Sequence, residues 1–143
     1  MSSTTLKVIL DHEKAVLPSK AHPTDTGYDL TAIKVHKKIS EITTMYDTGL
    51  IVKPSEGFYT EIRPRSSIYK TGYILANSTG VIDYSYRGHL FMVLTKVDAS
   101  KPDLEVPFCK CQLVVRKNEI SSLEKVLSFD EEKTTKVWIW INR

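Results

Sequence analysis

Short apolar runs recur along this chain, each rich in Val, Ile, Leu, Tyr or Phe and each broken by Gly, Pro, Asp or Ser. Several alternate with polar residues, which is the period-two pattern of a β-strand. The runs predict strands at 6–10, 31–36, 49–54, 58–63, 73–77, 89–97, 111–117 and 123–129. Short strands at spacings of about a dozen residues are typical of an all-β sandwich or barrel. One short helix is predicted over 66–72, with Gly72 as its stop.

Length and composition favour one small domain. The chain has 143 residues, so a single domain over 1–143 is predicted. Its net charge is +3, and Lys and Arg are scattered without a basic stripe, so no nucleic-acid partner is expected. We see no secretion signal and no stretch of transmembrane length, and we therefore expect a cytoplasmic or nuclear protein without membrane contact. Cys109 and Cys111 are predicted to be reduced thiols in a strand, because no histidine lies near enough to complete a zinc site.

The stretch "GVIDYSYRG" over 80–88 is the first candidate for chemistry. Its apolar start predicts a strand and its polar end predicts a turn, so we expect a β-hairpin with polar residues at the tip. Asp83 falls at the strand end, where we expect it to be partly buried and able to act as a general base. The alternative is a turn aspartate whose side chain caps its own backbone.

Two further stretches carry polar residues at turns. In "RPRSS", Arg65, Ser66 and Ser67 precede and open the short helix, and together they would make an anion site. The alternative there is an ordinary N-cap serine beside a solvated arginine. In "TDTGYDLTA", Gly27 predicts a turn and Asp29 enters a strand, where an isolated aspartate is more often structural than catalytic.

Taken together, these stretches resemble the motifs of one enzyme family, the trimeric dUTP pyrophosphatases (dUTPases). "GYDL" resembles the first motif, "PRSS" the second, "ANSTGVIDYSYRG" the third and "CQLVV" the core of the fourth, over residues 20 to about 130. The resemblance implies a distorted β-barrel or jelly-roll with one short helix. It also implies a homotrimer with active sites at the subunit interfaces. The implied reaction is hydrolysis of dUTP to dUMP and pyrophosphate with Mg²⁺, which keeps uracil out of DNA and supplies dUMP for dTMP synthesis.

The resemblance also assigns roles to individual residues. Asp83 matches the base that orients a water toward the α-phosphorus, and Tyr86 matches the ring that stacks on deoxyribose and excludes a 2′-hydroxyl. Asp29 matches a residue close to the water shell of the metal. The other substrate contacts implied are those to uracil and to the phosphates, namely Asn77, Gly80, Val81, Ile82 and Phe91 for the base, and Arg65, Ser66, Ser67 and Gln112 for the phosphates.

Several positions depart from the family pattern or separate it from its relatives. Ser67 stands where the family more usually has glycine, and Cys109 stands where it usually has arginine. The related dCTP deaminases share the fold, but their catalytic glutamate is Arg87 here and their arginine is Lys70. Deamination is therefore disfavoured, because no acid is present to shuttle the protons. A third possibility is a dUTPase fold retained as a nucleotide-binding or regulatory protein.

The end of the chain, "KVWIWINR" over 136–143, is an atypical hydrophobic tail. The family has there a glycine-rich fifth motif that closes over the triphosphate, but no glycine follows Gly88 in this chain. Each Trp-Ile pair read one base later must encode glycine, and permitted codons around the two pairs yield Arg-Phe-Gly-Phe-Gly-Ser-Thr. We therefore hypothesise that the tail is the fifth motif in a shifted reading frame, with a true final strand as the alternative. Weakened hydrolysis with retained nucleotide binding is expected.

Overall fold

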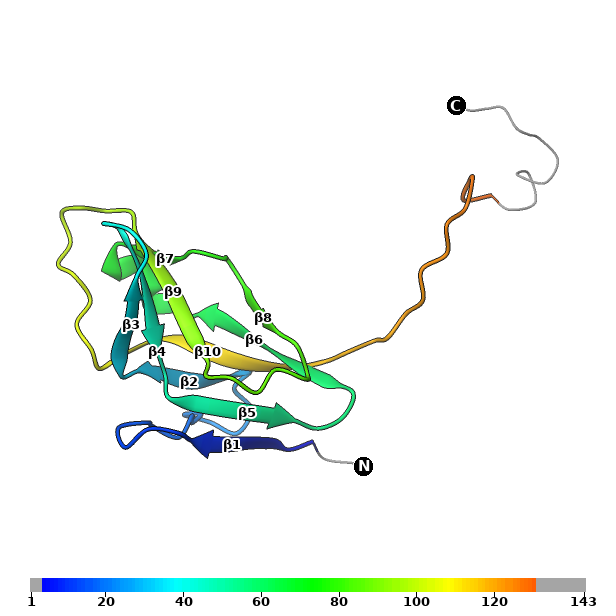
Figure 1. Ribbon diagram of the computed structural model, residues 1–143, viewed down its shortest axis with the longest axis horizontal. Helices are drawn as coiled ribbons and strands as arrows, with labels where there is room; N and C mark the ends of the chain where they lie inside the picture. The colour runs from blue at the N-terminus through cyan, green and yellow to red at the C-terminus, as the bar shows by residue number, and fades with distance from the viewer. Residues whose placement is uncertain (1–3, 131–143) are drawn as a thin grey trace.

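A computed structural model describes residues 4–130, which form ten β-strands and one short 3₁₀ helix, η1, over Ser66–Thr71 (Figure 1). The first five strands are β1 (Leu6–Leu10), β2 (Gly27–Ala32), β3 (Lys34–Lys38), β4 (Thr43–Asp47) and β5 (Leu50–Pro54). The remaining strands are β6 (Phe58–Pro64), β7 (Tyr73–Leu75), β8 (Gly80–Ile82), β9 (Phe91–Lys96) and β10 (Phe108–Lys117). The tail at 136–143, with its frameshift hypothesis, lies outside the described residues.

Two four-stranded antiparallel sheets enclose the core. One has the order β2-β10-β6-β8 and the other β3-β4-β9-β7, while β1 pairs with β5 in a separate two-stranded sheet. Because side chains alternate along a strand, each sheet turns one set of apolar residues inward. These inward residues are at most 3 % exposed and include Leu30, Ile62 and Leu113 from the first sheet, and Tyr46, Met92 and Leu94 from the second. The predicted all-β jelly-roll is confirmed.

Most of the predicted elements are present, with two differences in the middle of the chain. The predicted short helix is η1, and Gly72 ends it in the left-handed conformation at φ 76°. The run 31–36 is divided between β2 and β3, because the chain turns at Ile33, whose amide bonds to the Asp47 carbonyl at 2.9 Å. Strand β4 was not predicted, since its threonines obscure the apolar pattern, although Thr44 is buried.

The strand predicted at 123–129 is wrong. These residues have no regular secondary structure, and Leu123, Leu127 and Phe129 are 102 %, 86 % and 104 % exposed. Figure 1 shows this part of the chain leaving the end of β10 and running away from the sheets. A strand needs a neighbouring backbone for its hydrogen bonds, and within the described residues none lies beside this segment.

The hairpin predicted over 80–88 is also wrong in its pairing. Strand β8 pairs with β6 in the first sheet, whereas β9 pairs with β4 and β7 in the second. The turn between them therefore crosses from one sheet to the other instead of joining two paired strands. Leu90 anchors this crossing, because it is fully buried and its amide donates to the Leu50 carbonyl at 2.8 Å.

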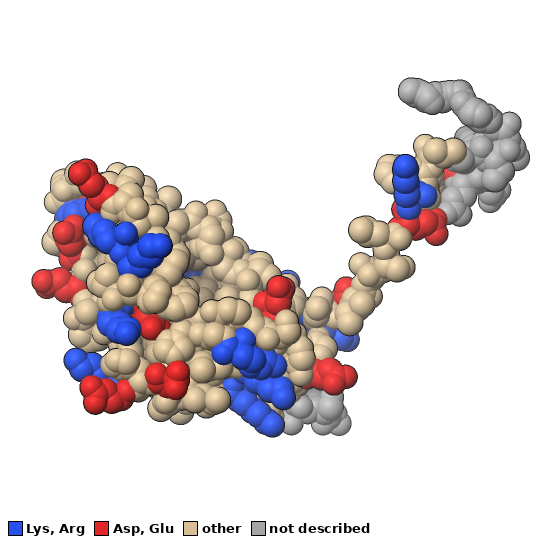
Figure 2. Space-filling view, viewed as in Figure 1, with Lys and Arg blue, Asp and Glu red and all other residues tan. Residues whose placement is uncertain are grey.

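Charged side chains of both signs are interspersed over the face shown in Figure 2. Alternating signs on one face are typical of a solvated surface, in contrast to the single-sign stripe of a nucleic-acid interface. Among the described residues, no helix combines the length and the apolar character needed to cross a bilayer.

Candidate active site

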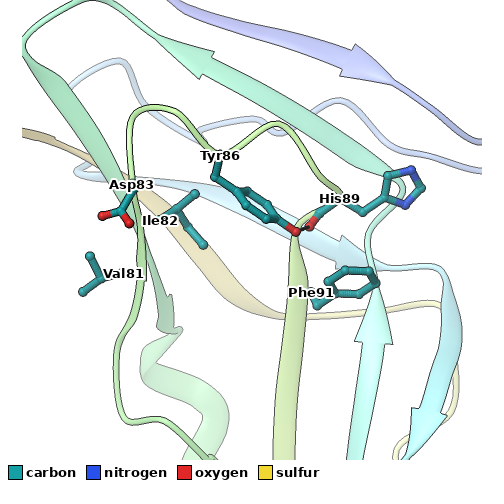
Figure 3. Close-up of a pocket in the computed structure, with 6 residues that line it drawn as sticks. All are labelled: Val81, Ile82, Asp83, Tyr86, His89 and Phe91. Atoms are coloured by element: carbon teal, nitrogen blue, oxygen red, sulfur yellow. Dashed lines mark hydrogen bonds between the residues drawn. The ribbon is translucent and has the colours of Figure 1, made fainter.

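The turn that links β8 to β9 borders a cavity of about 240 Å³. The cavity is lined by Val81, Ile82, Asp83, Tyr86, His89 and Phe91 (Figure 3). Five of these residues are site residues expected from the sequence, and His89 is an addition. In Figure 3, Val81 and Asp83 lie on one side of Ile82, and Tyr86, His89 and Phe91 lie on the other.

Asp83 is exposed, which corrects the expectation that it is partly buried. Strand β8 ends at Ile82, and the chain turns outward at the next residue. The turn is closed by the backbone, with the Tyr86 amide donating to the Asp83 carbonyl at 3.0 Å. Within residues 4–130, no group hydrogen-bonds to the Asp83 carboxylate, so the alternative of a side-chain cap is not observed. The carboxylate is therefore free to bind a water or a ligand.

Tyr86 is held over its own turn. Its hydroxyl donates to the His89 carbonyl at 2.7 Å, and the residue is 39 % exposed. Gly88 makes this possible, since a Cβ there would lie 2.5 Å from the Tyr86 hydroxyl oxygen. The turn thus requires glycine at 88 for lack of space rather than for an unusual backbone angle.

His89 lies between two carboxylates. Its Nδ1 is 3.0 Å from both carboxylate oxygens of Asp47, and its Nε2 is 2.7 Å from Asp11. Hydrogen bonds first to Asp11 and then to Asp47 raise the pKa of His89 above its usual value. Burial alone would raise the pKa of Asp47, but the Gly49 amide and His89 together lower it. Sequence reasoning missed this histidine, because both partners lie far away along the chain.

The second group of predicted residues gathers where β2, β6 and β10 meet. Arg65 Nε lies 3.3 Å from the Asp29 carboxylate. Arg65 Nη1 also donates to the carbonyl of Cys109 at 3.0 Å and lies 3.5 Å from its sulfur. Cys109 thus helps to hold Arg65 in place. Arg65 is itself the residue that precedes η1, without a side-chain cap, so an N-cap serine is not observed.

Gln112 belongs to the same group. Its Nε2 donates to the Pro64 carbonyl at 3.0 Å, and it pairs in register with Asp29 on β2. Gly27 leaves room for it, because a Cβ on Gly27 would lie 2.0 Å from Gln112 Oε1. Close packing against a glycine therefore orients the amide.

Gln112 also borders a second cavity, of about 390 Å³. Its other lining residues are Thr26, Glu61, Arg63, Pro64, Val114 and Arg116. Arg63 and Arg116 are cations that the sequence analysis did not single out, and Arg63 Nε is 3.2 Å from Glu61. The sequence did contain a signal for Arg63. It is opposite Gln112 in the pairing of β6 with β10, so both side chains lie on the same face of the sheet.

The two groups lie at opposite ends of β6. Thr60 is opposite Ile82 and Ile62 is opposite Gly80, so Asp83 lies beside Tyr59. Arg65 is beyond the other end of β6, six residues further along. At about 3.4 Å per residue this separation is roughly 20 Å.

Two predicted uracil contacts, Asn77 and Gly80, lie apart from the Asp83 cavity, and Gly80 pairs with Ile62 near the middle of β6. Asn77 is exposed, and its Nδ2 would lie 3.2 Å from a Cβ on Gly80. Neither residue lines the cavity that contains Asp83. The predicted uracil contacts are therefore divided within one chain, because Val81, Ile82 and Phe91 line the Asp83 cavity while Asn77 and Gly80 lie outside it.

Magnesium is the cofactor expected from the sequence. Among residues 4–130, no group of three or more His, Cys, Asp or Glu side chains is close enough to hold a metal ion. The Asp29 side chain is 38 % exposed, so it can accept a hydrogen bond from water while it pairs with Arg65. These residues fit a magnesium ion that brings phosphate oxygens and waters as its main ligands.

Comparison with known proteins places the chain among relatives with the same architecture. Residues 13–137 match the dUTPase family. A deoxyuridine 5'-triphosphate nucleotidohydrolase of Mycobacterium leprae is 34 % identical over 131 residues, covering 90 % of this chain and 85 % of that protein.

Solved structures agree on the fold. A variant of the dUTPase from phage phi11 of S. aureus, described with a structural Mg(II) ion, superposes with a TM-score of 0.73 at 22 % identity, covering 88 % of this chain and 99 % of that one. A Staphylococcus bacteriophage 80alpha dUTPase with dUpNHpp gives a TM-score of 0.66 at 21 % identity, covering 88 % and 90 %. From its match over nearly the whole length, its fold and its sequence relatives, the chain belongs to the dUTPase family.

Proposed function

We propose that this chain hydrolyses dUTP to dUMP and pyrophosphate. The observation that carries the proposal is the cavity at the end of β8, where the unpaired carboxylate of Asp83 and the tethered ring of Tyr86 face the same space. A carboxylate beside a nucleotide pocket can orient a water for attack on phosphorus, and an aromatic ring can stack on a sugar.

Each group of residues has a distinct task in this reaction. Asp83 accepts a hydrogen bond from the attacking water and takes up its proton as the bond to the α-phosphorus forms. Arg65, Ser66, Ser67 and Gln112 bind the phosphate oxygens, which neutralises charge and aligns the leaving pyrophosphate. When bound to the triphosphate, magnesium would add further charge neutralisation, and Asp29 would hold one of its waters.

We further propose that the active enzyme is a homotrimer. Asp83 and Arg65 are about 20 Å apart along β6. Within one chain they are too far apart for Asp83 to orient the attacking water while Arg65 binds the oxygens of the same triphosphate. A second copy would bring its phosphate-side residues to the Asp83 cavity of the first. The exposed Leu123, Leu127 and Phe129 would then be covered by a neighbouring subunit. We also propose that the enzyme acts in the cytoplasm or nucleus.

Pyrophosphate release from each deoxynucleoside triphosphate tests the proposal. We expect activity with dUTP alone and its loss in Asp83→Asn, which preserves size but removes the base. Asp103→Asn is the matched control, because that aspartate is also exposed but pairs with Lys96 away from the cavity. Ammonia release from dCTP would instead indicate a deaminase. Equal turnover by wild type and Asp83→Asn would refute the assignment of Asp83.

A further inference from the structure

His89 connects the candidate sugar-contacting residue to two distant parts of the chain. Its ring bonds Asp11, which is 78 positions earlier and follows β1, and Asp47, which is 42 positions earlier and ends β4. Its main-chain carbonyl accepts the hydrogen bond of the Tyr86 hydroxyl at 2.7 Å. One residue therefore joins a buried carboxylate, an exposed carboxylate and the ring that borders the cavity.

The inner partner of His89 is held firmly. The Asp47 side chain is 4 % exposed, and its Oδ1 accepts the Gly49 amide at 2.7 Å. Next to His89, the Leu90 carbonyl accepts the Thr48 hydroxyl at 2.7 Å and the Thr48 amide at 3.1 Å. The ring of His89 and the backbone of the neighbouring Leu90 are thus both tied to the turn between β4 and β5.

The outer partner is more accessible. The Asp11 side chain is 55 % exposed, while the His89 side chain is 24 % exposed. Both ring nitrogens face carboxylate oxygens, and only the doubly protonated imidazolium can donate from both. A neutral imidazole would withdraw one of its two hydrogen bonds. The exposed Asp11 is the carboxylate that can bind water in place of the ring.

We propose that His89 is a positioning residue: clamped between Asp47 and Asp11, it fixes the carbonyl that orients Tyr86, and so sets how strictly the site rejects ribonucleotides. The inference rests on the proposed function, in which the Tyr86 ring packs against the sugar. A ring that can tilt leaves space for a 2′-hydroxyl, so loosening the clamp weakens discrimination more than it weakens binding of the correct nucleotide.

The other charged and titratable groups near His89 act differently. Lys34 acts on Asp47, where it favours the ionised carboxylate. His36 packs on Phe91 with ring centroids 4.5 Å apart, and Asp83 lines the cavity on its other side. Arg87 donates to the carbonyls of Tyr84 and Tyr86, so its guanidinium is occupied within the turn. Among the described residues, Asp11 and Asp47 are therefore the groups that decide the charge on His89.

Calorimetric binding of dUMP and UMP to the full chain tests the proposal. In His89→Asn and Asp11→Asn we expect the preference for dUMP to fall by roughly two- to tenfold, the worth of one hydrogen bond. Asp11→Asn alters an exposed loop residue, so it tests the clamp even if His89→Asn fails to fold. In wild type the preference should decline as pH rises above the usual histidine range, whereas in His89→Asn it should not depend on that titration.

A double-mutant comparison identifies the route of the effect. Tyr86→Phe retains the ring but removes the hydroxyl, so adding His89→Asn to it should change the preference no further. Additive losses, or equal losses for dUMP and UMP, would overturn the proposal. If wild type binds dUMP selectively but releases no pyrophosphate from dUTP, the proposed hydrolysis fails while this binding test still decides the role of His89. If wild type shows no preference for dUMP, the proposal is wrong.

Discussion

Two inactive variants, each lacking one half of the site, should restore activity when they assemble together. The perturbation is Asp83→Asn in one chain and Arg65→Ala in the other. From the register of β8 on β6, Asp83 lies beside Tyr59, and six residues of strand separate it from the level of Arg65. This separation of about 20 Å exceeds the reach of either side chain, so one chain alone cannot complete the site.

The size of the rescue follows from the proposed trimer. In an equal mixture, a site is intact when its Asp83 comes from the Arg65→Ala chain and its Arg65 comes from the Asp83→Asn chain. With random assembly about one quarter of the sites meet both conditions, since each has a chance of about one half. The unfractionated mixture should therefore recover about a quarter of wild-type turnover. Trimers purified to contain both variants should recover about a third, because one of their three sites is intact.

Coexpression with two different affinity tags, followed by sequential purification, isolates the mixed assemblies for a pyrophosphate-release assay. The control mixes Asp83→Asn with Asp83→Ala, in which every site lacks the same residue and no rescue is expected. The contrary result would be mixed assemblies that form but release no more pyrophosphate than the mean of the two variants. That result would refute a site shared between chains.

Three further predictions concern single residues. Gly27→Ala places a methyl group against the Gln112 amide, so it should destabilise the fold by about 1–3 kcal/mol, as measured by urea unfolding. It should also raise KM for dUTP, and an unchanged KM would contradict the role of Gln112. The raised pKa of His89, due first to Asp11 and then to Asp47, means that its stabilisation is full below the unfolded value of about 6.5 and is lost as pH rises through the folded pKa. Thermal melts should show this decline, and His89→Asn should abolish it. Burial raises the pKa of Cys111 to about 12, so a thiol reagent at neutral pH should modify only Cys109 in the native protein, as read by mass spectrometry.

Much of this structure could be predicted because the responsible interactions are local. The buried Leu94 and Leu113 lie in strands that the sequence predicted at 89–97 and 111–117, and Gly72 was recognised as the end of the short helix. The residues around Asp83 and Arg65 were identified from short stretches whose turns, glycines and hydroxyls are legible within a few positions. Cys109 and Cys111 lie in strand β10, as the sequence predicted.

What depended on tertiary structure was the choice of partners. The sequence around 80–88 is compatible with a hairpin, yet β8 pairs with β6, because pairing is decided by the free energy of contacts between distant segments. The same holds for 123–129, whose apolar pattern suits a strand but has no partner beside it in the described chain. His89 gained its role only when folding brought Asp11 and Asp47 to its two nitrogens. Short-range patterns thus reveal which residues are able to act, while the pairing of distant strands decides which of them act together.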